Sequence, residues 1–236
     1  MKTVNSKTWN EIKTNDSWAI FKIMSEFVEG YERLSRIGPC VSIFGSARLK
    51  ENHQWYLKAQ NIAERLGELG YGIISGGGPG IMEAANRGAK KVNSPSVGLN
   101  IELEHEQSPN GFIDTDKSVD FDYFFVRKVM FVKYSQGFVV MPGGFGTLDE
   151  LFEALTLIQT KKIDKFPVVL VGKEYWSGLI DWITNTLMKN GLIGNDDLGI
   201  LSIVDSPEEA VKEINDFYEK YLLKPVSYTH LRAHET

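Results

Sequence analysis

A glycine-rich turn, a threonine and a carboxylate lie close together near the middle of this 236-residue chain, at residues 141–150 (MPGGFGTLDE). The apolar run 138–141 before the turn is typical of a buried strand, and apolar residues recur at helical spacing after it. A strand, a glycine turn and a helix start together present backbone N–H groups and the positive end of a helix dipole to an anion. We therefore expect a phosphate to be held by Gly143, Gly144, Gly146 and Thr147.

Thr147 and Glu150 add chemistry to this turn. Thr147 is predicted to cap the following helix and to donate its hydroxyl to a phosphate oxygen. Glu150 is predicted to lie about one turn into the helix, close to whatever the loop holds. A tight connection without a ligand is the plainer interpretation of an isolated glycine turn. Because three glycines, a threonine and an acid follow an apolar strand here, the sequence favours a ligand-binding loop.

A second glycine turn, at residues 76–80, also lies between an apolar run and a helical pattern. It lacks the G-x-G-x-x-G spacing of dinucleotide-binding folds, and close packing of a helix on a sheet explains it equally well. Arg127 opens a further predicted helix, where a cation is unfavourable for the helix dipole, so we expect an acid or a ligand beside it. Two glycine turns, Arg127 and Glu150 together indicate a phosphorylated, sugar-bearing ligand.

Four stretches of the sequence resemble the Lonely Guy (LOG) family of cytokinin riboside 5'-monophosphate phosphoribohydrolases, formerly called the lysine decarboxylase family. The central turn resembles the family's PGGxGTxxE signature, and residues 125–130 (FVRKVM) match its RKxxM segment. Residues 76–83 (GGGPGIME) resemble its glycine-rich helix start, and residues 44–48 (FGSAR) the end of its first strand. The resemblance covers residues 37–221, so it implies the family's fold and activity for most of the chain.

The resemblance implies that Arg127 and Glu150 form the catalytic pair, acting on adenosine monophosphate or its N6-prenylated cytokinin relatives to release the base and ribose 5-phosphate. Cleavage of an N-glycosidic bond gives the ribose oxocarbenium character, which a carboxylate can stabilise while it orients or deprotonates water. Arginine is a poor proton donor because its pKa exceeds ~12, so the role expected of Arg127 is electrostatic. The resemblance also implies substrate contacts at Gly45, Ser46, Gly77, Gly78, Lys128, Met130 and Thr156. For Thr156, the alternative is that its hydroxyl bonds back to its own helix.

Two other functions compete with hydrolysis. A Rossmann-like carrier, similar to the molybdenum-cofactor carriers, would hold a nucleotide or a nucleotide-bearing cofactor without cleaving it. The presence of both Arg127 and Glu150 favours the enzyme over the carrier. A lysine decarboxylase would need pyridoxal phosphate and a Schiff-base lysine beside an acid, and no lysine is placed in such a site. No His, Cys or Asp cluster has the spacing of metal ligands, so we expect neither a metal nor another cofactor.

The segments that must position these residues alternate between strands and helices. Apolar runs predict strands at 41–44, 71–75, 96–101, 122–125, 138–141, 167–171 and 200–204, with a polar loop at 112–120. Helical periodicity covers 18–31, 54–69, 81–89, 127–135, 148–158, 175–188 and 207–221, the last opened by a capping sequence at 206–209. The alternation predicts an α/β fold, a three-layer Rossmann-like arrangement with a mostly parallel sheet flanked by helices. Ligands bind such sheets at the carboxyl ends of the strands, where we expect the glycine turns to surround one pocket.

Composition bounds the function. The net charge of −5 argues against non-specific nucleic-acid binding, and 42% hydrophobic residues suffice for a sizeable core. The single cysteine, Cys40, excludes an intrachain disulfide and is expected to be a buried small hydrophobe. The polar N-terminus lacks the apolar core of a signal peptide, and no run is long enough to cross a membrane, so we expect a cytoplasmic location.

Assembly and chain ends complete the expectations. The helices at 18–31 and 127–135 carry more apolar side chains than one sheet face needs and, with the resemblance, predict a homodimer or higher homo-oligomer with its interface near the site. Residues 1–224 are expected to form one domain, of which 1–16 are polar and loose. Residues 225–236, with two of the four histidines and no clear period, are expected to be a non-native or disordered tail. In the loop after residue 101, Glu104 replaces a proline common in bacterial relatives, which leaves the role of Glu106 open.

Overall fold

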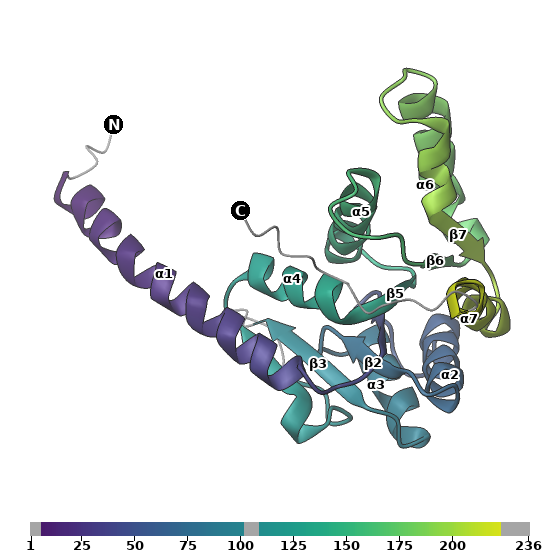
Figure 1. Cartoon of the computed structure of the whole chain (residues 1–236), viewed down its shortest axis with the longest axis horizontal. Helices are drawn as coiled ribbons and strands as arrows, with labels where there is room; N and C mark the ends of the chain where they lie inside the picture. The colour runs from purple at the N-terminus through teal and green to yellow at the C-terminus, as the bar shows by residue number, and fades with distance from the viewer. Residues whose placement is uncertain (1–5, 102–108, 223–236) are drawn as a thin grey trace.

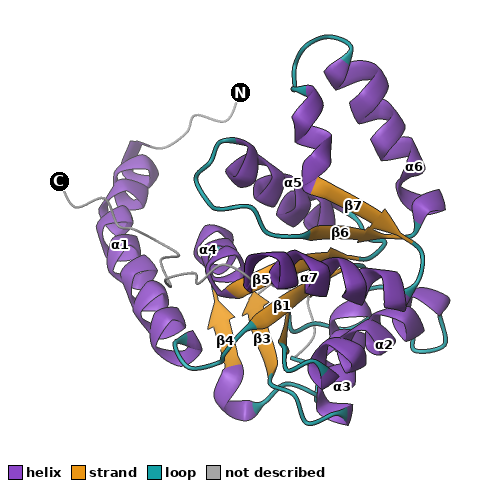
Figure 2. Cartoon of the chain, turned by 45° about the vertical axis from the view of Figure 1, so that its right-hand side comes forward, coloured by secondary structure: helices purple, strands orange, loops and turns teal. Residues whose placement is uncertain are grey.

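A parallel β-sheet runs through the centre of the computed structural model, which describes residues 6–101 and 109–222 (Figures 1 and 2). Within these ranges the sheet has seven strands in the order β4-β3-β2-β1-β5-β6-β7, and all neighbours are parallel. The strands are β1 (Cys40–Phe44), β2 (Gly72–Ser75), β3 (Ser96–Ile101), β4 (Ser118–Phe121), β5 (Ser135–Val140), β6 (Val168–Val171) and β7 (Leu201–Val204). The expected α/β class with a parallel sheet is therefore confirmed.

Helices cover both faces of the sheet (Figure 2). Side chains alternate along each strand, so Cys40 and Phe44 of β1 join one core while Val41 and Ile43 join the other. The first core lies under α1 (Ser6–Leu34), α4 (Phe124–Tyr134), α5 (Phe145–Gln159) and α6 (Lys173–Trp182). The second lies under α2 (Gln54–Glu68), α3 (Ile81–Lys91) and α7 (Pro207–Leu222). Short helical turns complete the described chain at Thr115–Lys117, Ile183–Met188 and Asn195–Ile200.

The direction of the chain across the sheet reverses between β1 and β5. Strands β1 to β4 follow one another outward to one edge, and α4 then returns the chain to β5 on the other side of β1. Loops that leave neighbouring strands in opposite directions open a crevice at their carboxyl ends, which is the usual ligand position in open α/β sheets. The loops after β1 and β5 carry Gly45 and Gly143, so two of the predicted ligand loops meet at this reversal.

Two local predictions are confirmed at the level of hydrogen bonds and burial. Ser206 accepts from the backbone N–H of Glu209 at 3.1 Å, while the Glu209 carboxylate accepts from the N–H of Ser206 at 3.1 Å. This is a reciprocal capping box, and it begins α7 as expected. Cys40 is fully buried in β1, and burial raises the pKa of its thiol to about 12, so it is a small core side chain.

The strand predicted at 122–125 is wrong. Residues 118–121 form β4, because Val119 and Phe121 alternate inward beside β3, so the predicted loop at 112–120 also contains part of a strand. Phe124 and Phe125 instead begin α4 and are 48% and 50% exposed. Arg127 consequently lies four residues into α4 and not at its start.

Helix α1 begins at Ser6, well before the predicted start, and extends beyond the rest of the molecule (Figure 1). Its C-terminal half is held on α4, where the Glu26 carboxylate accepts from the N–H groups of Asp122 and Tyr123 at 3.2 and 3.3 Å. Gly30 lets Met130 of α4 approach closely, since an added Cβ would lie 2.8 Å from Met130 Cε. Helix α1 therefore fixes the start of α4, the helix that carries Arg127.

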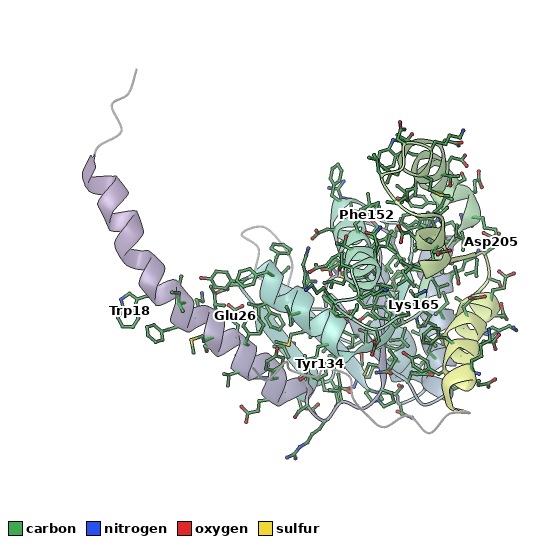
Figure 3. The ribbon with its side chains drawn as sticks, turned by 45° about the horizontal axis from the view of Figure 1, so that its top comes forward. Trp18, Glu26, Tyr134, Phe152, Lys165 and Asp205 are labelled. Atoms are coloured by element: carbon green, nitrogen blue, oxygen red, sulfur yellow. The ribbon has the colours of Figure 1, made fainter. Side chains whose placement is uncertain are left out.

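The outer face of α1 carries large apolar side chains. Trp18, Phe21 and Val28 are 75%, 63% and 64% exposed, and Trp18 projects away from the body of the molecule (Figure 3). No helix in the described ranges is long and apolar enough to span a membrane. The predicted tail at 225–236, the start of the polar N-terminal stretch and the loop containing Glu104 and Glu106 lie outside the described residues.

We propose that this outer face takes part in self-association, and we expect at least a dimer by light scattering at micromolar concentration. Phe21→Glu should lower the measured mass, because it places a charge among apolar side chains that association would bury. Lys189→Glu, at an exposed position outside α1, is the matched control and should leave the mass unchanged. A monomeric mass for the unmodified chain would contradict the prediction.

Candidate active site

Three loops at the carboxyl ends of the strands are joined through Ser46. The Ser46 N–H donates to Pro142 O at 3.0 Å, which ties the loop after β1 to the loop after β5. The Ser46 carbonyl accepts from Ile81 N at 3.0 Å, which ties it to the start of α3 and the glycine turn after β2. The structure thus brings Gly45, Ser46 and the turns at 76–80 and 143–146 to one edge of the sheet.

Close contacts with side-chain and backbone atoms explain why glycine occupies two positions in these turns. A Cβ on Gly143 would lie 2.1 Å from Thr147 Oγ1 and 3.0 Å from Ser46 N. Gly80 has a φ of 68°, in the left-handed region, and a Cβ there would lie 2.4 Å from Ser46 O. Any larger residue at either position would push the three loops apart.

The start of α5 presents backbone amides that no side chain caps. Gly144 is the N-cap residue and makes no side-chain cap, so the prediction that Thr147 caps this helix is wrong. Thr147 lies inside the first turn and is 7% exposed, with its hydroxyl beside Gly143. Phe145 is 93% exposed, which shows that the turn is open to solvent. A helix start of this kind suits an anion.

Arg127 is buried at the ends of β2 and β3. Its Nε donates to Leu99 O at 2.7 Å and its Nη2 to Gly76 O at 3.4 Å, and the guanidinium lies 5.2 Å from the centre of the Phe131 ring. The side chain is only 9% exposed. One carbonyl within β3 and one just after β2 therefore fix the orientation of the cation.

Glu150 is buried in the first turns of α5, at 7% exposure. Burial raises the pKa of its carboxyl to about 7, against the opposing effects of Arg127 and Lys128, while Glu153 and Asp149 raise it further. A carboxyl that titrates near neutral pH can accept a proton from water more readily than an ordinary surface glutamate can. The buried pair of Arg127 and Glu150 is the strongest candidate for catalysis in the described chain.

Two side chains absent from the predictions hold the glycine turns in place. Tyr175 of α6 donates its hydroxyl to Gly143 O at 2.6 Å. Asn110 Nδ2 donates to the carbonyls of Gly77 and Gly78, both at 3.0 Å. The sequence offers no local signal for either contact, because each joins residues more than 30 positions apart.

Lys128, Met130 and Thr156, predicted as substrate contacts, have other partners in this structure. Lys128 forms ion pairs with two acids of α5, and Met130 is fully buried against α1. The Thr156 hydroxyl donates back to Phe152 O at 2.7 Å, on an exposed part of α5. These contacts join Met130 to α1 and Thr156 to its own helix, and not to the glycine turns.

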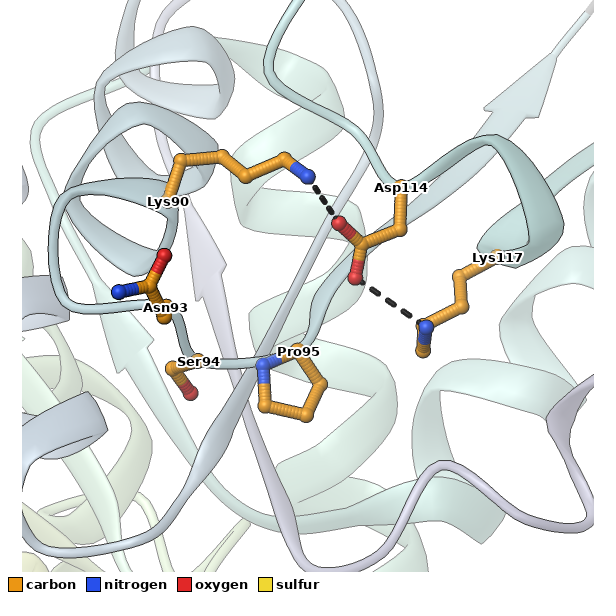
Figure 4. Close-up of a pocket in the computed structure, with 6 residues that line it drawn as sticks. All are labelled: Lys90, Asn93, Ser94, Pro95, Asp114 and Lys117. Carbon is orange, nitrogen blue, oxygen red and sulfur yellow. Dashed lines mark hydrogen bonds and ion pairs between the residues drawn. The ribbon is translucent and has the colours of Figure 1, made fainter.

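A hollow of about 260 Å³ lies at the opposite edge of the sheet, before the start of β3 (Figure 4). Its two lysines, Lys90 and Lys117, both pair with Asp114, so its charges are largely satisfied. Among residues 6–101 and 109–222, no group of three His, Cys, Asp or Glu side chains could hold a metal ion. The candidate site is therefore the glycine-turn edge, not this hollow.

Known proteins resemble this chain in sequence and in fold. The family model described as "Possible lysine decarboxylase" matches residues 82–214. A cytokinin riboside 5'-monophosphate phosphoribohydrolase of Mycobacterium tuberculosis is 35% identical over 100 residues, 42% of this chain and 52% of that protein. A pyrimidine/purine nucleotide 5'-monophosphate nucleosidase of Escherichia coli is 27% identical over 164 residues, 64% of this chain and 35% of that protein. The chain spans about half or less of the curated relatives it matches.

A solved structure supports the fold independently. The molybdenum cofactor binding protein of Rippkaea orientalis superposes with a TM-score of 0.53 at 21% identity, over 76% of this chain and 96% of that one. At this identity the likeness concerns the fold alone. The family match covers more than half of the chain and includes the segment from Arg127 to Glu150. The chain belongs to the Lonely Guy (LOG) family, whose members were first grouped as possible lysine decarboxylases.

Proposed function

We propose that this protein hydrolyses the N-glycosidic bond of nucleoside 5'-monophosphates, releasing the free base and ribose 5-phosphate. The observation that carries the proposal is the buried Glu150, with its pKa raised to about 7, beside the buried Arg127 and the open glycine turn. The names of the relatives, a phosphoribohydrolase and a nucleotide nucleosidase, describe the same class of reaction.

The phosphate is assigned to the start of α5. Its oxygens would accept hydrogen bonds from the amides of Gly144 and Gly146 and from the Thr147 hydroxyl. Gly143 lets the turn approach Ser46 closely. Binding at the phosphate fixes the distant glycosidic bond relative to Glu150, so energy from a non-reacting group serves to orient the reacting one.

Glu150 acts on the ribose in this proposal. Water oxygen attacks C1', the bond from C1' to the base nitrogen breaks with its electron pair going to the base, and the Glu150 carboxylate takes the proton from water. The departing base takes up a proton from solvent, and Glu150 returns its own proton to solvent before the next turnover. The same carboxylate stabilises the oxocarbenium character of the ribose before attack. Arg127 stabilises the negative charge that develops on the departing base, without giving up its own proton.

The direct test is incubation of the purified protein with adenosine monophosphate, followed by chromatography for adenine and ribose 5-phosphate. Both products should appear in equal amounts. An N6-prenylated adenosine monophosphate and a pyrimidine monophosphate, assayed in parallel, would define the base preference. Tight nucleotide binding without product would overturn the proposal and favour a nucleotide carrier of the same fold.

Thr147→Ala is expected to raise KM by ~10-fold or more, the scale of a lost hydrogen bond to a charged group, with a smaller fall in kcat. The phosphate does not change during the reaction, so its contacts contribute almost equally to ground state and transition state. Thr160→Ala, at the other end of α5, is the matched control because the Thr160 hydroxyl donates only to the carbonyls of Thr156 and Leu157. Equal KM values for the two variants in steady-state assays would remove Thr147 from phosphate binding.

A further inference from the structure

Lys128 joins α4 to α5 at the position of the catalytic pair. Its Nζ lies 2.7 Å from Asp149 Oδ1 and 2.9 Å from Glu153 Oε2. The side chains of Lys128 and Glu153 are 16% and 31% exposed and that of Asp149 is 54% exposed, so the lysine and Glu153 are better shielded from water than a typical surface pair, and Asp149 is not. Both acids belong to α5, one residue before Glu150 and three residues after it.

The sequence neighbours of this ion pair are the catalytic candidates themselves. Arg127 precedes Lys128 on α4, and Glu150 follows Asp149 on α5. A contact between Lys128 and the two acids therefore fixes how α4 lies against α5 at the one place where Arg127 must face Glu150. A bridge to two carboxylates one turn apart restrains both the separation and the rotation of the helices.

Lys128 also changes the balance of charge around the Glu150 carboxyl. The charged groups that act on Glu150 are Arg127 and Lys128 from α4, and Asp149 and Glu153 from its own helix. Without Lys128, the carboxylates of Asp149, Glu150 and Glu153 would lie together on α5. Arg127 would then be the one cation left among the charged groups that act on Glu150. Like charges at this spacing favour protonation, and protonated Glu150 could neither stabilise a ribose cation nor accept a proton.

We propose that Lys128 is a positioning residue that holds α4 against α5 and neutralises the two acids flanking Glu150, instead of contacting the substrate. The inference rests on the proposed function, because it assigns Lys128 its effect on the same reaction. The family resemblance alone would make Lys128 a substrate contact, and this inference gives it a positioning role.

The test is the pH dependence of kcat/KM for adenosine monophosphate hydrolysis by Lys128→Met. Because the carboxylate form of Glu150 is the active one, the acid limb of the profile reports its pKa. Lys128→Met should move this limb to higher pH by on the order of one unit, with KM measured on the alkaline plateau unchanged. Lys128→Arg keeps the charge and should restore the limb. Lys133→Met, an exposed lysine of the same helix, is the matched control and should not move it.

Glu153→Gln supplies the opposite perturbation. It removes a negative charge near Glu150 while Asp149 still holds Lys128, so the acid limb should move to lower pH. General damage to the fold would not shift the limb in opposite directions for the two variants. A raised KM with an unmoved limb in Lys128→Met would overturn the inference and return Lys128 to substrate binding.

Failure of the inference can be told apart from failure of the proposed function. If the unmodified protein releases no base from any nucleotide, the proposed function fails, and the Glu150 carboxyl is then titrated directly. Carbon-13 NMR of glutamate-labelled protein, with the Glu150 signal assigned from Glu150→Gln, should show a higher midpoint in Lys128→Met and a lower one in Glu153→Gln. Unchanged midpoints would overturn the electrostatic role of Lys128.

Discussion

Glu150→Gln is expected to lower kcat by ~10²-fold or more, the usual scale for a lost general base or charge stabiliser. Glutamine keeps the size of the side chain and some of its hydrogen bonds, but it can neither carry a negative charge nor accept a proton from water. Positive charge appears on the ribose only as the glycosidic bond breaks, so the loss falls on the transition state and not on binding. Nucleotide should bind Glu150→Gln at least as tightly, because one negative charge near the phosphate has gone.

Steady-state kinetics and calorimetry with adenosine monophosphate separate these effects. A low kcat with an intact binding isotherm is the expected result. Hydrolysis by Glu150→Gln at close to the unmodified kcat would take Glu150 out of the mechanism. Loss of both activity and binding would mean that the carboxylate holds the ground-state complex together.

Stability gives an independent check that Glu150→Gln is folded. The pKa of Glu150 is raised from 4.5 to about 7 in the folded protein, because burial disfavours the charged carboxylate. The folded state therefore binds this proton more tightly than the unfolded state, and the stabilisation is complete below pH 4.5 and lost as the pH rises through about 7. Glutamine does not ionise, so the variant should be more stable than the unmodified chain at pH 8 by up to about 3 kcal/mol, and little different near pH 4. Thermal denaturation at the two pH values measures the difference.

Arg127→Lys is expected to lower kcat/KM by ~10²-fold or more even though the charge is kept. The planar guanidinium donates from Nε to Leu99 O, within β3, and from Nη2 to Gly76 O, just after β2. A lysine ammonium is a compact point charge that cannot span both carbonyls while it faces Glu150. The buried cation would then settle away from the position in which it stabilises the departing base.

Arg36→Lys is the matched control for this substitution, because Arg36 is exposed after the end of α1. It should leave kcat/KM unchanged. Circular dichroism and thermal denaturation of both variants report whether the fold is kept. Activity of Arg127→Lys within a few-fold of the unmodified protein would show that charge alone suffices and that the carbonyls of Leu99 and Gly76 do not orient a catalytic group.

Local sequence patterns determined the elements of this fold. Buried strands of a parallel sheet are short apolar runs, and the runs at β1, β3, β5 and β6 were visible because apolar residues predominate in them, although Ser42, Ser96 and Asn100 are buried among them. The glycine turn before α5 was visible because glycine, threonine and an acid fall at fixed offsets from a strand. The capping box of α7 depends on Ser206 and Glu209, which are three positions apart, so it could be predicted from the local sequence alone.

The same reasoning failed where two local patterns overlapped. The aromatic residues 123–125 are as apolar as a strand, yet they lie across the start of α4, and the true strand β4 is hidden by Asp120 and Ser118 on its polar face. Thr147 has the right residue type for a cap but lies inside the helix, because Gly144 already begins it. Helix starts differ by a few residues with little change in local energy, and tertiary packing selects among them.

Only the tertiary structure decided which residues form the site. Strand order places β1 between β2 and β5, so Ser46 can bond to the loops that follow strands distant in sequence. Tyr175, Asn110 and the partners of Lys128 follow from that arrangement. The sequence by itself supplied Arg127 and Glu150 as residue types within a recognisable motif. Their burial, and with it a carboxyl that titrates near neutral pH, depends on the low-polarity surroundings that α4, α5 and the sheet create when they pack together.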